Sequence, residues 1–513
     1  MKKITRILVS QRFIVTLTAI LQIGLVYGLF STLTTRAPAI YTALVLLSVL
    51  AVVFLFDNDT MNPSYKIIWL LLMVVFPVTG GLFYVFFGNR RLPRKSAEAI
   101  QRVEEAANNA LVPQPEAFLG LAEAFDSDYD AHAIYLQNAT KSPVCGNTEC
   151  TYFSEGEHFW EAFCDELKKA EKFIFLEFFI IDEGYVWDTV LEILRNKVAE
   201  GVNVKLLYDD LGCIFTLEEN FPEQMRSLGI ECYAFNPVRL STNISSYLML
   251  NHRDHRKICI IDGNVGFNGG VNLADEYINK KVRFGHWKDT AYMIKGPAVF
   301  NLTATFSKCW QIASREVFDY ETCRPTVSYP FDGYVQPFDD TPLDDQPVSQ
   351  FAYLNVINRA EEYVYITTPY LIIDSDMFTA LSLAAKSGID IRIVTPAIPD
   401  KWYAFWVTQS YYKGLLNAGV RIFEYTPGFM HAKMYLSDDD LAIVGSANMD
   451  YRSLFLHFES CATFYGGQFV KDVKKDFMGI FEVSKEITIE EVNKTPLPKR
   501  LIQLVFRLFA PMM

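Results

Sequence analysis

The sequence lacks a pattern of paired cysteines: its nine cysteines are odd in number and scattered, and none forms a C-x-x-C pair. This usage fits a reduced compartment better than a disulfide framework, and it indicates no structural zinc site. An excess of positive charge is also missing, because 47 Lys and Arg stand against 60 Asp and Glu, which gives a formal net charge of −13. Nucleic-acid binding needs a basic surface, so we expect no nucleic-acid partner.

Long polar stretches are scarce as well. Hydrophobic residues make up 50% of the chain and aromatic residues 14%, whereas charged residues reach 21%. This composition excludes intrinsic disorder over most of the chain. The 513 residues are enough for a membrane region and one large or two medium globular domains. The chain has no G-x4-G-K-S/T nucleotide loop, so we expect no cofactor of that kind.

Three apolar runs open the chain, at about 13–33, 39–56 and 67–87, and each is close to the roughly 20 residues that cross a membrane as a helix. Basic residues flank them on both sides: Lys2, Lys3, Arg6 and Arg12 precede the first run, and Arg90, Arg91, Arg94 and Lys95 follow the third. Because cytoplasmic flanks collect Lys and Arg, both flanks are expected inside the cell. We therefore predict a multi-pass protein of the cell membrane with two full crossings and a cytoplasmic catalytic part; three crossings are the alternative.

Composition divides the chain into six segments, which are a membrane region (1–95), a helical connector (96–149), a first half (150–319), a proline-rich linker (320–350), a second half (351–496) and a tail (497–513). The connector is expected to act as a spacer. The linker is expected to be an exposed loop without chemistry. The tail, LPKRLIQLVFRLFAPMM, is basic and amphipathic, which fits a helix that dips into anionic lipid and equally one that docks on protein.

From about residue 150 onward, segments rich in β-branched and aromatic residues alternate with helical periods, which predicts an α/β fold. The same order occurs twice, and AEKFIFLEFFIID at 170–182 resembles AEEYVYITTPYLIID at 360–374. The predicted elements are helix 157–170, strand 173–181, helix 186–200 and strand 203–208, then helix 351–361, strand 363–368, helix 376–387 and strand 389–394. We therefore expect a duplicated pair of α/β halves related by a pseudo-twofold axis.

One motif stands at the equivalent place in each half. Residues 255–272 are HRKICIIDGNVGFNGGVN, and residues 431–448 are HAKMYLSDDDLAIVGSAN. Both have His at the first position, followed by Lys at +2, Asp at +7, Gly at +14 and Asn at +17. On a strand, His and the Lys two residues later point to the same face. Two such strands, brought together from the two halves, would offer two imidazoles and two cations to a single substrate atom.

That combination suits the exchange of a phosphodiester. The reaction needs a nucleophile and an acid for the leaving alkoxide, which His255 and His431 can share. Fixed cations must stabilise the charge of the transition state, and Lys257 and Lys433 can supply them. With these groups in place, no metal is required.

The residues after each strand are further candidates for contacts with the substrate. The amides of Asn272 and Asn448 can donate to non-bridging oxygens, and Ser446 is another donor. Gly270, in the turn before Asn272, is placed with this substrate-binding set.

The remaining polar residues of the motifs are open to two interpretations. Asp262 and Asp438 complete the motifs and are counted with the catalytic set, although a turn-shaping role is favoured for both. Glu276 and Glu459 could orient a catalytic imidazole. Three further histidines lack a duplicated frame and are expected to have no role in catalysis: His252, His286 and His457.

The duplicated H-x-K-x4-D with a following G-G/S-x-N resembles the phospholipase D superfamily, and the order of segments is similar to bacterial cardiolipin synthases of that type. The likeness covers nearly the whole chain and includes PVTGGLFYVFFGNRR, NHRDHRK, GGVNLADEY, HWKDT, AGVRIFEYTPGFMHAK and GSANMDYRS. Asp254 stands where this family usually carries Asn, and TTPYLIID lacks the usual Pro-Asp ending.

The resemblance implies that two phosphatidylglycerols become cardiolipin and glycerol through a phosphatidyl-histidine. It also implies that His255 is the nucleophile and that His431 protonates the departing glycerol and later deprotonates the incoming hydroxyl. No cofactor or metal is implied, and the expected partners are phosphatidylglycerol and cardiolipin in the membrane. The residues leave one alternative open, a phospholipase D-type hydrolase that uses water as acceptor. They do not predict an oligomeric state.

Overall fold

A computed structural model describes residues 38–57, 61–76, 94–238, 251–330, 333–344 and 346–512, together with Gly28, Thr35, Gly80, Gly81 and Tyr84. The chain divides into two units, Met1–Arg91 and Leu92–Met513. Each unit is considered by itself.

The first unit contains two apolar helices, α3 (Pro38–Asp57) and α4 (Pro63–Val75). Asn62 caps α4, because its side-chain oxygen accepts a hydrogen bond from the backbone N–H of Ser64 at 3.0 Å. Among the described residues, α3 is the one helix that is long and apolar enough to cross a membrane. The predicted run at 13–33 lies outside the described residues, and the run at 67–87 is described as a helix only to Val75. A multi-pass arrangement is therefore not supported.

The second unit is built on two mixed sheets whose strands follow the same order, apart from an additional edge strand in the second. In spatial order the first sheet contains β1 (Glu149–Phe153), β9 (Ala291–Lys295), β7 (Val265–Gly269), β6 (Lys257–Ile261), β2 (Phe173–Phe178), β3 (Asn203–Asp209) and β4 (Glu231–Phe235). The second contains β10 (Tyr334–Asp340), β17 (His457–Tyr465), β16 (Leu441–Gly445), β15 (Met434–Ser437), β11 (Tyr363–Thr367), β12 (Asp390–Pro396), β13 (Arg421–Tyr425) and β18 (Ser484–Ile487).

The two sheets correspond strand by strand. In each, the strand of the predicted motif, β6 or β15, runs antiparallel to β2 or β11, and the next two strands continue in parallel. The central strands are buried on both faces, as expected for parallel strands that helices cover. The predicted α/β fold and its duplicated halves are confirmed, while the pseudo-twofold axis itself stays a prediction.

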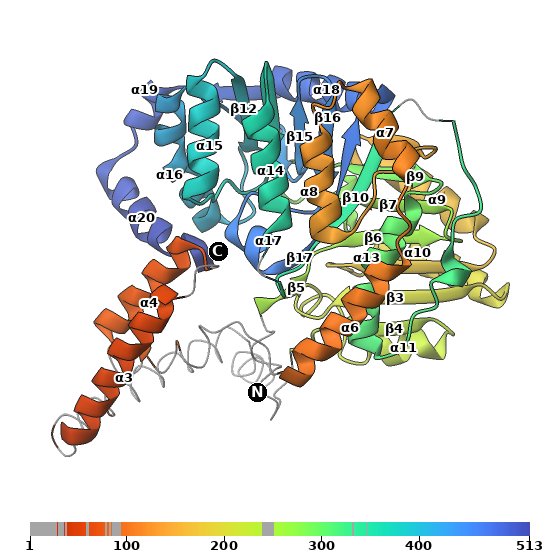
Figure 1. Ribbon diagram of the computed structural model, residues 1–513, viewed down its shortest axis with the longest axis horizontal. Coiled ribbons are helices and arrows are strands. Elements are labelled where there is room, and N and C mark those ends of the chain that lie inside the picture. Colours follow the sequence, from red (N-terminus) through yellow and green to blue (C-terminus); the bar gives the residue numbers. More distant parts are fainter. Residues whose placement is uncertain are drawn as a thin grey trace. The chain divides into compact units, whose positions relative to one another are not determined.

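Helices form layers on both sides of the sheets. In the first half these are α9 (Gly156–Lys169), α10 (Tyr185–Ala199), α11 (Phe221–Ser227), η3 (Asp275–Ile278), α13 (Val299–Ser314) and η4 (Glu321–Cys323). In the second half they are α14 (Val348–Arg359), α15 (Ser375–Lys386), α16 (Trp402–Ala418), α17 (Tyr451–Phe455), α18 (Gly467–Val483), α19 (Ile489–Asn493), α20 (Leu497–Leu508) and η5 (Ala510–Met512). Figure 1 shows α14, α15 and α16 side by side over the second sheet.

One hydrophobic core joins the two halves. It contains Phe306 of α13 and Phe477 of α18 together with residues of both sheets, such as Ile258 and Met434. The helices α13 and α18 therefore pack between the sheets, and this shared core fixes one half against the other.

The connector and the linker differ from their predicted roles. Residues 94–140 form α6 (Arg94–Ala110), α7 (Pro115–Ala124) and α8 (Asp130–Thr140). These helices belong to the second unit, where α6 packs on α13 and α8 on α14, so they do not act as a spacer. The predicted exposed linker contains β10, and six of its seven residues are buried. Its Pro337 is tolerated because β10 is an edge strand, where a missing N–H breaks no second ladder.

Candidate active site

The first residues of strands β6 and β15 bring the two motifs to equivalent edges of their sheets. Lys257 lies opposite Phe178, the last residue of β2, and Met434 lies opposite Thr367, the last residue of β11. His255 and His431 therefore stand beside the carboxyl ends of the parallel strands, the edge at which α/β sheets bind ligands. Only 7% of His255 and 8% of His431 are exposed.

Two short strand pairs interlock the halves at this edge. The strand β5 (Arg253–Asp254), just before the first motif, pairs with the start of β17 in the second half. The strand β14 (Gly428–Met430), just before the second motif, pairs with β8 (His286–Lys288) in the first half. Each motif is thus held by backbone hydrogen bonds to the other half.

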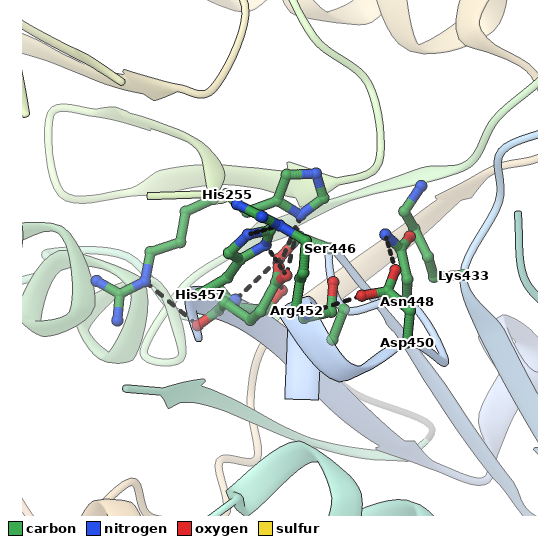
Figure 2. A network of polar contacts seen from close by, with 12 residues as sticks. His255, Lys433, Ser446, Asn448, Asp450, Arg452 and His457 are labelled. Atoms are coloured by element: carbon green, nitrogen blue, oxygen red, sulfur yellow. Dashed lines mark hydrogen bonds and ion pairs between the residues drawn. The ribbon is translucent and has the colours of Figure 1, made fainter. Parts of the chain in front are cut away.

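Each imidazole also contacts a carboxylate from the other half. Nδ1 of His255 lies 3.0 and 3.1 Å from the two oxygens of Glu459 (Figure 2). Nδ1 of His431 lies 2.6 Å from Oδ2 of Asp289. With the ring proton on Nδ1, each histidine donates to its carboxylate and turns the lone pair of Nε2 toward a substrate.

Asp289 and Glu459 are equivalent in the strand register. Gly269 pairs with Ala291, and Gly445 pairs with Cys461, so each carboxylate comes two residues before the partner of its glycine. Glu459 was expected as an orienting residue, whereas Asp289 was not predicted. Asp289 lies in the motif HWKDT. The spacing from the first motif to Asp289 differs from the spacing from the second motif to Glu459, so only the pairing register could have identified Asp289.

Burial favours the neutral form of both imidazoles. It lowers the pKa of His255 to about 3, against the opposing effect of Glu459. It lowers the pKa of His431 to about 4, and the charges of Lys433 and of Lys257 lower it further. The charge of Lys257 thus acts on His431, which places the two motifs near each other.

The two lysines of the motifs are buried cations. Burial lowers the pKa of Lys257 to about 7, and the charge of Lys433 contributes to the fall, while Glu459 opposes it. Burial lowers the pKa of Lys433 to about 8 against the opposing charge of Asp289. Each amine donates a hydrogen bond to the backbone carbonyl of its own motif histidine. An anion bound between the lysines would raise both pKa values and hold both amines charged.

Gly270 and Ser446 lie against the two carboxylates, Asp289 and Glu459 respectively. A Cβ added at Gly270 would come 2.0 Å from Oδ1 of Asp289, so only glycine leaves room for that side chain. At the equivalent position, the hydroxyl of Ser446 donates to Oε2 of Glu459 at 2.5 Å (Figure 2). The predicted donation from Ser446 to the substrate is therefore replaced by a contact that positions Glu459.

The two asparagines use part of their amide groups within the protein. Asn272 donates to the hydroxyl of Tyr277 at 2.8 Å and accepts from the backbone N–H of Ile180 at 3.0 Å. Asn448 donates to Asp450 at 3.1 Å. An amide nitrogen carries two hydrogens, so each asparagine keeps one donor for a ligand.

Asp262 and Asp438 lie at the other ends of their strands. The carboxylate of Asp262 accepts from the backbone N–H groups of residues 171, 172 and 173 at 2.7–2.9 Å. Asp438 does the same with residues 361, 362 and 363 at 2.8–3.0 Å. Five strand residues, about 16 Å at 3.3 Å each, separate Asp262 from the start of β6. Their placement in the catalytic set is thus corrected to the favoured structural role.

The other predicted side chains divide between the site and its surroundings. Glu276 pairs with Arg283 at 2.7 Å and orients neither imidazole. His286 contacts the hydroxyl of Tyr425 at 2.9 Å, and the backbone carbonyl of His252 accepts from Asn236.

His457 lies at the site, contrary to the expectation for it. Its ring lies 5.4 Å from that of His255, and its Nδ1 lies 3.6 Å from Oε1 of Glu459 (Figure 2). Trp287 takes the equivalent place beside His431, at 5.2 Å between ring centroids.

Two clusters in the described part of the chain have the residue types of a metal site. They are His255, His457 and Glu459, and, behind the first motif, Glu177, Asp254 and Cys309. A guanidinium lies against each: Nε of Arg452 is 3.4 Å from Nε2 of His457, and Nη1 of Arg256 is 3.3 Å from Sγ of Cys309. These fixed positive charges oppose a cation in either cluster. Asp254, in the second cluster, is fully buried.

Comparison with known proteins identifies the family. A family model described as "Cardiolipin synthase, PLD-like domain" matches residues 163–310 and 353–481, more than half of the chain. The chain belongs to this family. A second model, "Phospholipase D-nuclease N-terminal", matches residues 44–89.

Individual relatives agree with this assignment. A cardiolipin synthase of Geobacillus sp. (strain WCH70) is 34% identical over 91% of this chain and 92% of that protein. A protein of Streptococcus mutans serotype c, described as uncharacterized, is 41% identical over 89% of this chain and 98% of that protein. The crystal structure of phosphatidylserine synthase from Haemophilus influenzae Rd KW20 has the same fold, with a TM-score of 0.57, 14% identity, and coverage of 74% of this chain and 100% of that one.

The chain is a membrane-associated phosphatidyltransferase, as its family and the apolar helix α3 indicate. The predicted enzyme class is thereby confirmed. The nine cysteines are all free, as their scattered positions predicted.

Proposed function

We propose that the protein transfers a phosphatidyl group from one phosphatidylglycerol to a second, which gives cardiolipin and glycerol. The observation that carries the proposal is the pair of motif imidazoles, each in hydrogen-bond contact with a carboxylate of the other half. The curated cardiolipin synthases that resemble the chain over most of its length support the choice of substrate class.

In the first step, Nε2 of His255 attacks the phosphorus of one phosphatidylglycerol, and a P–N bond forms as the P–O bond to glycerol breaks. His431 gives its Nε2 proton to the departing glycerol oxygen. Asp289 stabilises the imidazolium that this role requires, and the negative phosphodiester raises the low pKa of His431 when it binds. Lys257 and Lys433 stabilise the charge on the non-bridging oxygens.

In the second step, His431 takes the proton from the terminal hydroxyl of a second phosphatidylglycerol. The resulting oxygen attacks the phosphorus, and the P–N bond to His255 breaks. One phosphodiester replaces another, so no energy carrier is consumed. The low exposure of both imidazoles favours an alcohol over water as the acceptor.

The decisive experiment supplies the purified protein with phosphatidylglycerol in bilayers and measures lipid and water-soluble products. We expect cardiolipin and glycerol in equal amounts, and a loss of at least about a thousandfold in turnover in His255→Ala and in His431→Ala. Phosphatidic acid with glycerol as the products would instead establish the alternative, a phospholipase D-type hydrolase.

The assignment of the nucleophile has its own test. A reaction quenched during turnover should contain a phosphoramidate on the peptide with His255, and the His255→Ala variant should contain none. Covalent phosphorus on His431 in the native enzyme would reverse the two roles.

We also propose that the catalytic unit is cytoplasmic and that the chain returns across the membrane after α3. The support is the basic residues on both sides of the apolar region, which cytoplasmic flanks collect. Reporter fusions after residues 12, 60 and 95 should report inside, outside and inside. An outside reading after residue 95 would place the catalytic unit on the other face.

A further inference from the structure

The helix α20 has its polar and apolar faces reversed relative to a helix on a water-exposed surface. Its polar side chains point at α16: Gln503 is buried, and Lys499 donates to Gln409 at 2.9 Å. Arg507 donates to the backbone carbonyl of Ser410, and its guanidinium lies 4.1 Å from the ring centroid of Tyr411. Figure 1 shows α20 beside α16.

The apolar side chains of α20 and of the turn after it point away from α16. They are between 41% and 67% exposed and comprise Leu497, Leu501, Ile502, Leu504, Val505, Leu508, Phe509 and Met512. A surface helix in water turns such residues toward the core, and an apolar patch of this kind marks a surface that something covers. We call these eight residues the outer face of α20.

The outer face continues onto the start of α16. Trp402 is 56% exposed, its ring contacts Phe506 at 5.5 Å between centroids, and its neighbours Ile398 and Tyr403 are also exposed. Tryptophan and tyrosine concentrate where a membrane meets water. The patch therefore has an apolar centre and an aromatic border.

The aromatic border follows a loop whose charge acts on the second motif. Asp400 accepts a hydrogen bond from the hydroxyl of Tyr370 at 2.6 Å. Its charge also reaches Lys433, where it opposes the fall in pKa that burial causes. The loop that leads into Trp402 is thus part of the surroundings of the second motif.

Charge distinguishes a lipid surface from other partners. The helix α20 contains three basic residues and no acidic one, and Lys401 stands at the aromatic border. An amphipathic helix with this charge binds membranes that contain anionic lipids.

We propose that the outer face of α20 and the start of α16 insert into the interfacial layer of an anionic membrane. The apolar side chains enter the acyl region, and Trp402 and Tyr403 lie at headgroup level. This arrangement would hold the site against the lipids on which the enzyme acts. The activity test of the arrangement therefore rests on the proposed function.

A binding measurement tests the proposal without any reaction. An environment-sensitive fluorophore is attached to Leu504→Cys in the full chain, reconstituted in vesicles of phosphatidylcholine and phosphatidylglycerol with spin-labelled acyl chains. Leu383→Cys is the matched control, because Leu383 on α15 is 60% exposed and Leu504 is 56% exposed. The probe at residue 504 should shift to the blue and lose at least half of its emission to the lipid quencher, while the probe at residue 383 changes little.

Three outcomes would overturn the proposal. A blue-shifted probe at residue 504 that the lipid quencher does not reach would mean that protein covers the outer face, either from α3 and α4 or from a second copy of the chain. An unshifted probe would mean that the face stays in water. Equal quenching at residues 383 and 504 would mean that the contact is not specific.

An activity measurement then tests the consequence. The double variant Leu501→Glu/Leu504→Glu should lose at least tenfold in turnover of phosphatidylglycerol in bilayers. On short-chain phosphatidylglycerol dissolved as monomers it should stay within about twofold of the native enzyme, which also shows that it folds. The control Leu383→Glu should match the native enzyme on both substrates.

Equal loss on both substrates, or no loss on bilayers, would contradict the proposal. A native enzyme that is inactive on both substrates would refute the proposed function instead, and the quenching result would still stand on its own.

Discussion

At the scale of single residues, the site depends on a neutral imidazole held by a buried carboxylate. Glu459 stays ionised, because its contacts with His255 outweigh the burial that alone would raise its pKa. Asp289 likewise has a pKa below its usual value in spite of burial, because of His431. These two carboxylates fix the ring orientation and compensate the imidazolium that forms when a ring takes up a proton.

The first prediction concerns these carboxylates. Asp289→Asn and Glu459→Gln should each lower turnover by about a hundredfold or more, because an amide can hold the wrong ring tautomer and cannot balance a positive charge. Steady-state kinetics on phosphatidylglycerol vesicles measure the loss, and thermal unfolding should show little change. Near-native turnover in either variant would show that its carboxylate is not needed.

A second prediction uses a glycine. Gly270→Ala places a methyl group 2.0 Å from Oδ1 of Asp289 and should displace this carboxylate from His431, with a loss of about tenfold or more in turnover. Gly479→Ala is the matched control, since nothing lies within 4 Å of its added Cβ. Similar activity in the two variants would contradict the tight fit at Gly270.

A third prediction concerns pH. Burial lowers the pKa of Lys257 to about 7 and of Lys433 to about 8, so these two side chains lose positive charge as pH rises from 7 to 9. Sulfate, whose charge is constant over this range, should inhibit at least tenfold more weakly at pH 9 than at pH 7. Its inhibition constant from competition kinetics checks this, and a constant value would show that neither lysine titrates in this range.

The repeated motif was enough to find the histidines and lysines from sequence, because each pair alternates on one strand and occurs twice. Asp289 lies 34 residues after His255, whereas Glu459 lies 28 residues after His431, so no fixed spacing relates them. His457 was set aside for the same reason. Contacts between the halves depend on strand register, which the sequence does not reveal.

At the scale of elements, the two motif aspartates tie the end of one strand to the beginning of another. Both adopt a left-handed backbone, with φ of 55° at Asp262 and 52° at Asp438, which aspartate tolerates better than most residues. Three N–H groups at the start of β2, and three at the start of β11, converge on one carboxylate each.

Asp262→Ala should therefore reduce stability and spare the chemistry. Loss of three hydrogen bonds to a carboxylate should cost about 3 kcal/mol and, in a unit of this size, lower the melting temperature by roughly 3–4 °C. Asp262→Asn keeps one acceptor and should show a smaller shift. Turnover of the remaining folded enzyme, measured well below its melting temperature, should stay within a few fold; a loss as large as that of His255→Ala would restore Asp262 to the catalytic set.

The helix and strand pattern was predicted well in the paired segments, since 173–181 forms β2 and 351–361 forms α14 to within a few residues. The strand β10 was missed because its Pro337 and flanking aspartates are typical of a loop. Its burial comes from pairing with β17, more than a hundred residues later. Local sequence does not report such a partner.

At the scale of the whole molecule, the shared core and the exchanged strand pairs make one catalytic unit from two halves of one chain. Mixing the His255→Ala and His431→Ala proteins should therefore restore no activity. Mixtures at several ratios in one vesicle preparation, assayed for cardiolipin, measure this. Recovery toward a quarter or more of native turnover would mean that chains exchange halves and that the site forms between two molecules.

Because each imidazole contacts a carboxylate of the other half, the site can form only after both halves have been translated. Glu459 follows His255 by 204 residues, and His431 is translated only shortly before it. A nascent chain that has already made its first motif therefore has neither the anchor for that ring nor the acid for a leaving group. On the proposed chemistry, a nascent chain beside the membrane therefore cannot cleave a phosphodiester until Glu459 and the second motif have been translated and have paired with the first half.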